Sequence, residues 1–138
     1  MAATTRSYPR SHHPLEAVSH ATIVALTVAT AAIHASLGGL LFMANAVGYA
    51  TLAVLIALPG PVARVRWLVR LALLGFTTMT IAGWLAFGAR FQLAYVDKGV
   101  ELLLVALVAA EIWRLDGGPT GVVRRAHRLV ADVARLPG

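Results

Sequence analysis

The chain has 138 residues, of which 59% are apolar and 13% are charged, and its mean hydropathy is +0.76. Soluble domains are about 45–50% apolar and about 25% charged, so this composition indicates a membrane protein. The net charge of +6 is accompanied by no aromatic and basic platform, which argues against nucleic acid as a partner. Cysteine is absent, so disulfides and thiolate metal ligands are excluded.

Residues 1–16 are polar and are predicted to form a flexible cytoplasmic tail. Four apolar windows follow, each long enough for the roughly 20 residues that cross a bilayer. These spans are predicted at about 17–37, 40–58, 67–87 and 95–114, with Gly or Pro between them. Connections this short favour antiparallel neighbours. We therefore expect an all-α integral membrane protein, in which residues 17–116 form a four-helix bundle of transmembrane helices.

The first span has a second interpretation. Basic residues before an apolar run, and the small residues of AAIHA, are also typical of a cleaved signal peptide. The apolar run continues into the second span after only Gly38-Gly39, so we favour an uncleaved helix.

The connections differ in their content of basic residues. With four spans, the N-terminus, the second connection and the C-terminus share one side of the membrane. That side holds Arg6, Arg10, Arg64, Arg66, Arg70, Arg114, Arg124, Arg125, Arg128 and Arg135, whereas the other side holds Arg90 and Lys98. Short cytoplasmic loops retain Arg and Lys, so we predict a multi-pass protein of the cell membrane with both termini in the cytoplasm.

Residues 119–138 are predicted to form an amphipathic basic helix at the membrane surface. Its apolar stripe consists of Val122, Ala126, Leu129, Val133 and Leu136, which recur at helical spacing. Its basic face carries Arg124, Arg125, Arg128 and Arg135. Such a helix binds anionic lipid head groups, with about 1 kcal/mol from each basic side chain. Docking of the same stripe against a partner membrane subunit is the alternative.

The first span carries two patterned sets of residues. His20 and His34 lie about 21 Å apart along one helix and on roughly the same face. This spacing resembles that of the haem-bearing helices of b-type cytochromes, which implies these two residues as haem ligands. The other spans contain no histidine, so a second ligand has to come from a methionine or a second copy of the chain. We favour the alternative, in which the imidazoles form hydrogen bonds near the interfaces and no cofactor is bound.

The second set consists of small residues, Ala17, Ala21, Ala25 and Ala29. Small residues at this spacing allow helix backbones to approach closely. We expect this stripe to pack inside the bundle, with a contact in a homo-oligomer as the alternative.

The stretch from Ala94 to Trp113, AYVDKGVELLLVALVAAEIW, is long enough to cross a bilayer, but Asp97, Lys98 and Glu101 lie in its first two turns. Charges at that depth are expensive, so they face the bundle interior and find partners. Their spacing of three and four residues allows all three to share one helix face. One polar residue from each of the other spans falls at a similar depth. We therefore predict an intramembrane polar cluster that comprises His34, Asn45, Thr80, Asp97, Lys98 and Glu101.

Three interpretations of this cluster are open: a structural network, a ligand, ion or proton site that opens to the outer face, and a contact surface for a partner. The sequence contains no recognisable nucleophile with its base, phosphate loop or metal-ligand spacing, so we expect neither catalysis nor a metal. The expected function is that of a non-enzymatic accessory or interaction subunit of a membrane complex. A small transporter or proton-conducting protein is the alternative, and a haem-bearing electron carrier is the third.

Overall fold

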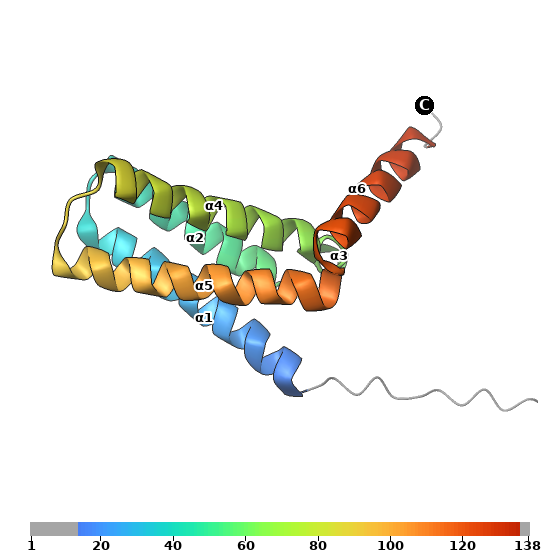
Figure 1. The fold of residues 1–138 in the computed structure, drawn as a ribbon, viewed down its shortest axis with the longest axis horizontal. Helices are drawn as coiled ribbons and strands as arrows, with labels where there is room; N and C mark the ends of the chain where they lie inside the picture. Colours follow the sequence, from blue (N-terminus) through green and yellow to red (C-terminus); the bar gives the residue numbers. More distant parts are fainter. Residues whose placement is uncertain (1–13, 136–138) are drawn as a thin grey trace, which may run out of the picture.

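The computed structural model describes residues 14–135, except for the side chain of Val133. This part of the chain is helical and contains no strand, which confirms the all-helical class. Its helices are α1 (Pro14–Leu37), α2 (Leu40–Ala57), α3 (Pro61–Arg64), α4 (Arg66–Phe87), α5 (Gln92–Asp116) and α6 (Gly118–Ala134) (Figure 1).

The four long helices α1, α2, α4 and α5 pack side by side, and each runs antiparallel to the next one along the chain (Figure 1). Both α1 and α4 contact α2 and α5, so the four helices enclose a common core. One end of the bundle, called the turn end below, holds Gly38-Gly39 and residues 88–91. At the opposite end, called the α6 end, α1 begins, α5 ends and α6 leaves the bundle (Figure 1).

Glycines permit the sharp changes of direction between helices. Gly38 and Gly39 have φ values of 69° and 82°, which an L side chain rarely adopts, and they reverse the chain between α1 and α2. Gly117 has a φ of 78° and ends α5 in the left-handed conformation, with its N–H donated to the carbonyl of Ile112. The helix that follows therefore points away from the bundle (Figure 1).

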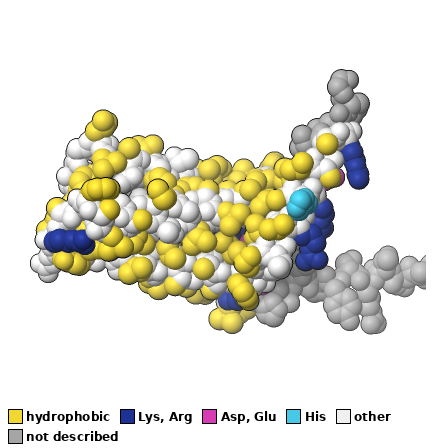
Figure 2. Space-filling view, turned by 45° about the horizontal axis from the view of Figure 1, so that its top comes forward, with side chains coloured by type: hydrophobic (Ala, Val, Ile, Leu, Met, Phe, Trp, Pro, Cys, Tyr) yellow, Lys and Arg dark blue, Asp and Glu magenta, His cyan; other side chains and the backbone are white. Residues whose placement is uncertain are grey.

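Three of the helices, α1, α2 and α4, are long and apolar enough to cross a membrane. Their bounds differ from the predicted spans by at most three residues, which is the difference between Pro14 and the expected start at residue 17. Apolar side chains cover the visible sides of the bundle, whereas Lys and Arg gather at its ends (Figure 2). An apolar surface this extensive fits lipid better than water.

The middle of the bundle is a largely apolar layer, to which α1 and α4 add buried threonines. Ile23, Ile56, Leu73, Leu104 and Val108 are fully buried there, and together they come from all four long helices. Close packing of such side chains is a main source of attraction between helices in lipid. This layer separates two groups of buried ionisable residues, one towards each end of the bundle.

The boundaries of the terminal segments need correction. Residues 14–16 were expected to belong to the tail, but they form the first turn of α1. A proline fits the first turn of a helix because its missing N–H has no partner there in any case. Residues 1–13 lie outside the described part of the chain. A helix was expected at 119–138, and the structure has α6 at Gly118–Ala134. Residues 136–138 lie outside the described part of the chain. The short helix α3 was not expected.

The expectation that the alanine stripe of α1 packs inside the bundle is wrong. Ala17, Ala21, Ala25 and Ala29 are all exposed. The buried face of α1 consists instead of Ile23, Thr27, Thr30 and His34. Exposure to lipid costs more free energy for a polar side chain than for alanine. The polar side chains therefore determine which face of the helix is buried.

Candidate functional site

One face of α5 is buried along most of the helix. Its members are Asp97, Glu101, Leu104, Val108 and Glu111. Their spacing alternates between four and three residues, which keeps them on a single stripe of the helix. The stripe carries carboxylates near both ends and apolar residues in the middle, so α5 places ionisable groups inside the bundle at two levels.

Glu101 is the centre of the group nearer the turn end. It is 0% exposed. Its Oε1 accepts hydrogen bonds from the hydroxyls of Tyr49 at 2.8 Å and Thr80 at 2.9 Å, and its Oε2 accepts one from Lys98 Nζ at 2.5 Å. These donors come from α2, α4 and α5, so one carboxylate joins three helices.

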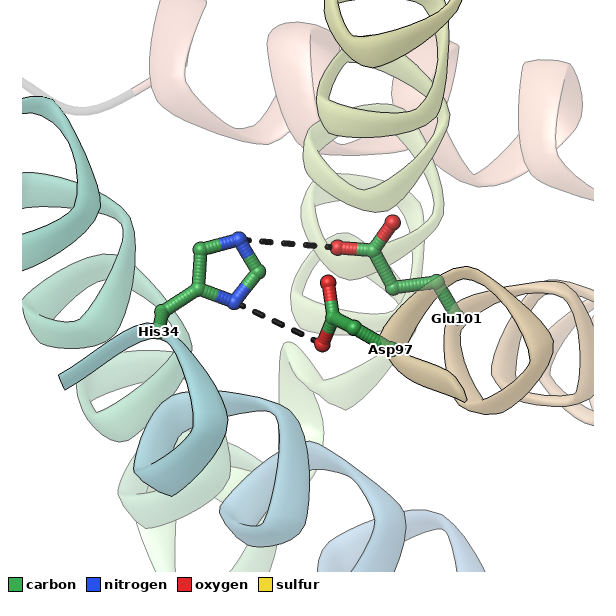
Figure 3. Close-up of side chains that lie close together, drawn as sticks. All are labelled: His34, Asp97 and Glu101. Carbon is green, nitrogen blue, oxygen red and sulfur yellow. Dashed lines mark ion pairs between the residues drawn. The ribbon is translucent and has the colours of Figure 1, made fainter. Parts of the chain in front are cut away.

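Asp97 and His34 lie beside this carboxylate (Figure 3). Lys98 Nζ is 3.1 Å from Asp97 Oδ2, which places the ammonium group between the two carboxylates. His34 Nδ1 lies 3.0 Å from the carbonyl oxygen of Thr30 and 3.6 Å from Asp97 Oδ1. Its Nε2 lies 3.9 Å from Glu101 Oε1. We call His34, Tyr49, Thr80, Asp97, Lys98 and Glu101 the histidine cluster.

The histidine cluster has an excess of negative charge. Asp97 and Glu101 carry two negative charges and Lys98 carries one positive charge, which leaves one negative charge when His34 is neutral. All four side chains are buried. Within the described residues, no group donates a hydrogen bond to Asp97 Oδ1. An uncompensated buried charge is strongly unfavourable, so the cluster calls for one further positive charge.

A cavity of about 530 Å³ borders the cluster at the turn end. Its polar wall is formed by His34, Asn45, Thr80, Asp97 and Lys98. Its aromatic wall includes Phe42, Phe76, Trp84, Phe87 and Phe91. Aromatic walls with a few convergent polar groups are typical of small-molecule sites. The volume falls within the usual range for such sites, about 300–1,000 Å³.

A second group of ions, in which Arg70, Glu111 and Asp116 are buried, lies towards the α6 end. Arg70 Nε is 2.9 Å from Glu111 Oε2, and Arg70 Nη1 is 3.1 Å from Asp116 Oδ2. Asp116 Oδ1 is 3.1 Å from Arg125 Nη1, and the Ser19 hydroxyl donates to Glu111 Oε1 at 3.0 Å. We call these five residues the arginine cluster. Its two cations and two carboxylates balance, and every carboxylate oxygen has a partner, as expected of a structural network.

Five of the six residues predicted for the intramembrane cluster come together. They are His34, Thr80, Asp97, Lys98 and Glu101. Asn45 lines the cavity beside them, but among the described residues its side chain makes no hydrogen bond to the cluster. Tyr49 was missed, although its spacing of four residues from Asn45 places both on one helix face.

Sequence reasoning also missed the arginine cluster. Arg70 was counted with the cytoplasmic connections, but its side chain is buried inside the bundle end. Glu111 continues the four-three spacing of Asp97, Glu101, Leu104 and Val108, and that continuation was the available signal.

His20 and His34 are at opposite ends of α1. His34 is engaged with Thr30 and the two carboxylates, whereas His20 is only partly buried. These contacts favour His34 as a member of the histidine cluster. Haem ligation by His20 and His34, the third interpretation of the sequence, is not tested by these contacts.

The arginines predicted for the basic face of the last helix separate into two groups. Arg124, Arg128 and Arg135 are exposed. Arg125 is also exposed, but its guanidinium pairs with Asp116 and donates to the carbonyl of Leu115 at 3.2 Å. Arg125 therefore ties the start of α6 to the end of α5.

Comparison of the chain with protein-family models, curated proteins and solved structures found no match.

Proposed function

We propose that this chain is a small, non-enzymatic membrane protein that binds a positively charged solute in the cavity at the turn end. The observation that carries this proposal is the excess negative charge of the histidine cluster on the wall of that cavity. Ionisable groups inside membrane bundles commonly belong to pathways for substrates, ions or protons. The proposal corresponds to a small transporter or conducting protein.

The contrast between the two clusters supports a binding role for only one of them. Both contain two carboxylates within the same bundle. The arginine cluster is balanced and its carboxylate oxygens are paired, whereas the histidine cluster lacks one positive charge and leaves Asp97 Oδ1 without a donor among the described residues. A purely structural role accounts for the first arrangement, whereas the second, with His34 neutral, favours a role in binding a cation.

The proposal includes an arrangement in the membrane. In it α5 is a fourth span, shielded by α1 and α4, and the turn end with its cavity faces the outside. The excess of basic residues at the α6 end supports cytoplasmic termini. Val123, Leu129 and Val130 of α6 are exposed beside Arg124 and Arg128, which supports binding of this helix to anionic lipid on the inner leaflet.

Thermal unfolding of the purified chain in detergent, with a panel of inorganic and organic cations, tests the binding proposal. A ligand that binds the native state raises the unfolding temperature with increasing concentration. Asp97→Asn removes the excess negative charge with little change of shape, so this variant is expected to lose the response to cations.

The matched control is Asp116→Asn, the same substitution in the arginine cluster. It leaves the two arginines with a single carboxylate, so its unfolding temperature should fall while its response to cations is preserved. A full response in Asp97→Asn, or the absence of any response in the parent chain, would contradict the proposal.

A second function is favoured by α6. This helix projects from the bundle with apolar side chains exposed, and the same surface suits a partner membrane subunit (Figure 1). An accessory role in a complex would be supported by a defined partner that co-purifies from native membranes and is lost when Leu129 and Val130 are replaced by Ser. Retention of that partner by the variant would count against docking through α6.

A further inference from the structure

The histidine cluster contains the donor atoms of a metal site. His34, Asp97 and Glu101 each offer one ligand atom, and these atoms lie within 4.8 Å of one another (Figure 3). Ligand atoms held at about 2.1 Å from a tetrahedral ion lie roughly 3.4 Å apart. Displacements of the ligand atoms by about an ångström therefore bring them to metal-binding distances. The three residues come from α1 and α5, which explains why no ligand spacing is visible along the sequence.

The hydrogen bond of His34 determines which ring nitrogen is free. A carbonyl oxygen can only accept, so Nδ1 must carry the proton that it donates to Thr30 at 3.0 Å. In the neutral imidazole, Nε2 then presents its lone pair towards Glu101 Oε1, 3.9 Å away. Two acceptors that face each other across this gap can share a proton or a metal ion. Metal-binding imidazoles commonly donate their other N–H to a backbone carbonyl in the same manner.

The carboxylate oxygens of Asp97 and Glu101 are also placed to bind a cation. Asp97 Oδ1 is buried, lies towards His34 and accepts no hydrogen bond within the described part of the chain. Glu101 is held in orientation by the hydroxyls of Tyr49 and Thr80. Partners of this kind orient the ligands of metal sites.

Building on the function proposed above, we infer that the solute is a divalent first-row transition metal ion, bound by His34 Nε2, Asp97 and Glu101 in exchange for the Lys98 ammonium group. Lys98 lies between the same two carboxylates and also lines the cavity, so its flexible side chain can swing into that space. A divalent ion then neutralises both carboxylates. Lys98 is thus a tethered cation that occupies the site until the metal replaces it.

The donor set indicates the class of metal. One imidazole nitrogen and two carboxylates suit Zn²⁺, Mn²⁺, Fe²⁺, Co²⁺ or Ni²⁺, whereas Mg²⁺ and Ca²⁺ prefer oxygen ligands alone. The cavity beside His34 and Asp97 leaves room for a further ligand from its interior, such as water.

Titration calorimetry of the purified full chain with Zn²⁺ tests this inference, with Mg²⁺ as the control ion. We expect Zn²⁺ to bind with a stoichiometry of one per chain. In Lys98→Met the competing ammonium is gone, so Zn²⁺ should bind at least about tenfold more tightly and raise the unfolding temperature more than in the parent. The matched control is Arg70→Met, which removes the cation from the carboxylates of the arginine cluster and should produce no such gain.

A spectroscopic measurement tests the same site without Lys98→Met. Co²⁺ bound in four-coordinate geometry has strong visible absorption, which the parent should show and His34→Gln should lose. Failure of Zn²⁺ to bind either the parent or Lys98→Met would overturn the metal assignment. If organic cations still gave a response that depends on Asp97, the function proposed above would stand without the metal. Equal gains in Lys98→Met and Arg70→Met would also overturn the assignment, because they would show binding to any exposed pair of carboxylates.

Discussion

Lys98→Met removes the ammonium group from the histidine cluster and roughly preserves side-chain volume. Lys98 Nζ lies 2.5 Å from Glu101 Oε2 and 3.1 Å from Asp97 Oδ2, so the substitution leaves two buried carboxylates without a cation. Removal of one partner from a buried ion pair costs about 3–5 kcal/mol. A chain of this size loses roughly 2–4 °C of unfolding temperature per kcal/mol, so we expect a fall of about 10 °C when metal ions are chelated.

A double-mutant cycle separates the ion pair from other effects. In Glu101→Gln, the side-chain amide can still form hydrogen bonds with the hydroxyls of Tyr49 and Thr80, but its interaction with Lys98 is weaker. We therefore expect the free energy of unfolding to fall by about 1–2 kcal/mol. The combined Lys98→Met and Glu101→Gln variant carries one uncompensated carboxylate in place of two. It should therefore be more stable than Lys98→Met alone, with a coupling energy of about 2 kcal/mol.

Tryptophan fluorescence and circular dichroism during unfolding in mixed micelles provide the measurement. The control is Arg90→Met, because Arg90 is exposed at the turn end, 4.2 Å from the ring centre of Trp84. Its loss should cost about 1 kcal/mol or less. Strictly additive losses in the cycle, together with free access of a water-soluble thiol reagent to Glu101→Cys, would refute the reasoning, since both show that Glu101 lies in water.

Three further predictions follow from the helix arrangement. Reporter fusions at Gln92 should be exported and fusions at the C-terminus should be cytoplasmic, because basic residues gather at the α6 end; an exported C-terminus would eliminate the four-span arrangement. A peptide of residues 119–138 should become helical on anionic vesicles and bind less as salt rises, whereas equal binding to neutral vesicles would remove the electrostatic contribution. Gly121→Ala forces a methyl group against the backbone carbonyl oxygen of Asp116 and should lower the unfolding temperature by several degrees. Gly99→Ala, which meets open space within α5, is the control and should be neutral or stabilising in the same melts.

The helices themselves were largely predictable, because each apolar window is bounded by residues that interrupt helices. Gly38-Gly39 and Gly117 end helices at the expected places, and both adopt positive φ values. The predicted start of α1 was too late, because hydropathy does not distinguish a polar first helical turn from a polar tail; the helix begins at Pro14.

The histidine cluster was predictable only in part. Depth along each span brought His34, Thr80 and Glu101 to one level, because a helix rises by a constant distance per residue. Depth does not say which face of a helix is turned inward. Tyr49 was therefore missed, and the alanines of α1 were assigned to the interior although they are exposed.

The sequence by itself determined the order and approximate bounds of the long helices and the levels at which ionisable residues occur, since hydropathy, helix breakers and helical rise are local properties of the chain. Only the tertiary structure decided the rotation of each helix about its axis and the partners that result. Arg70 and Glu111 meet across 41 positions of sequence. The side chains of His34, Tyr49 and Thr80 reach Glu101 from three other helices. No local pattern specifies such contacts, because they arise when buried charges on one helix turn towards ions and hydrogen-bond donors on neighbouring helices.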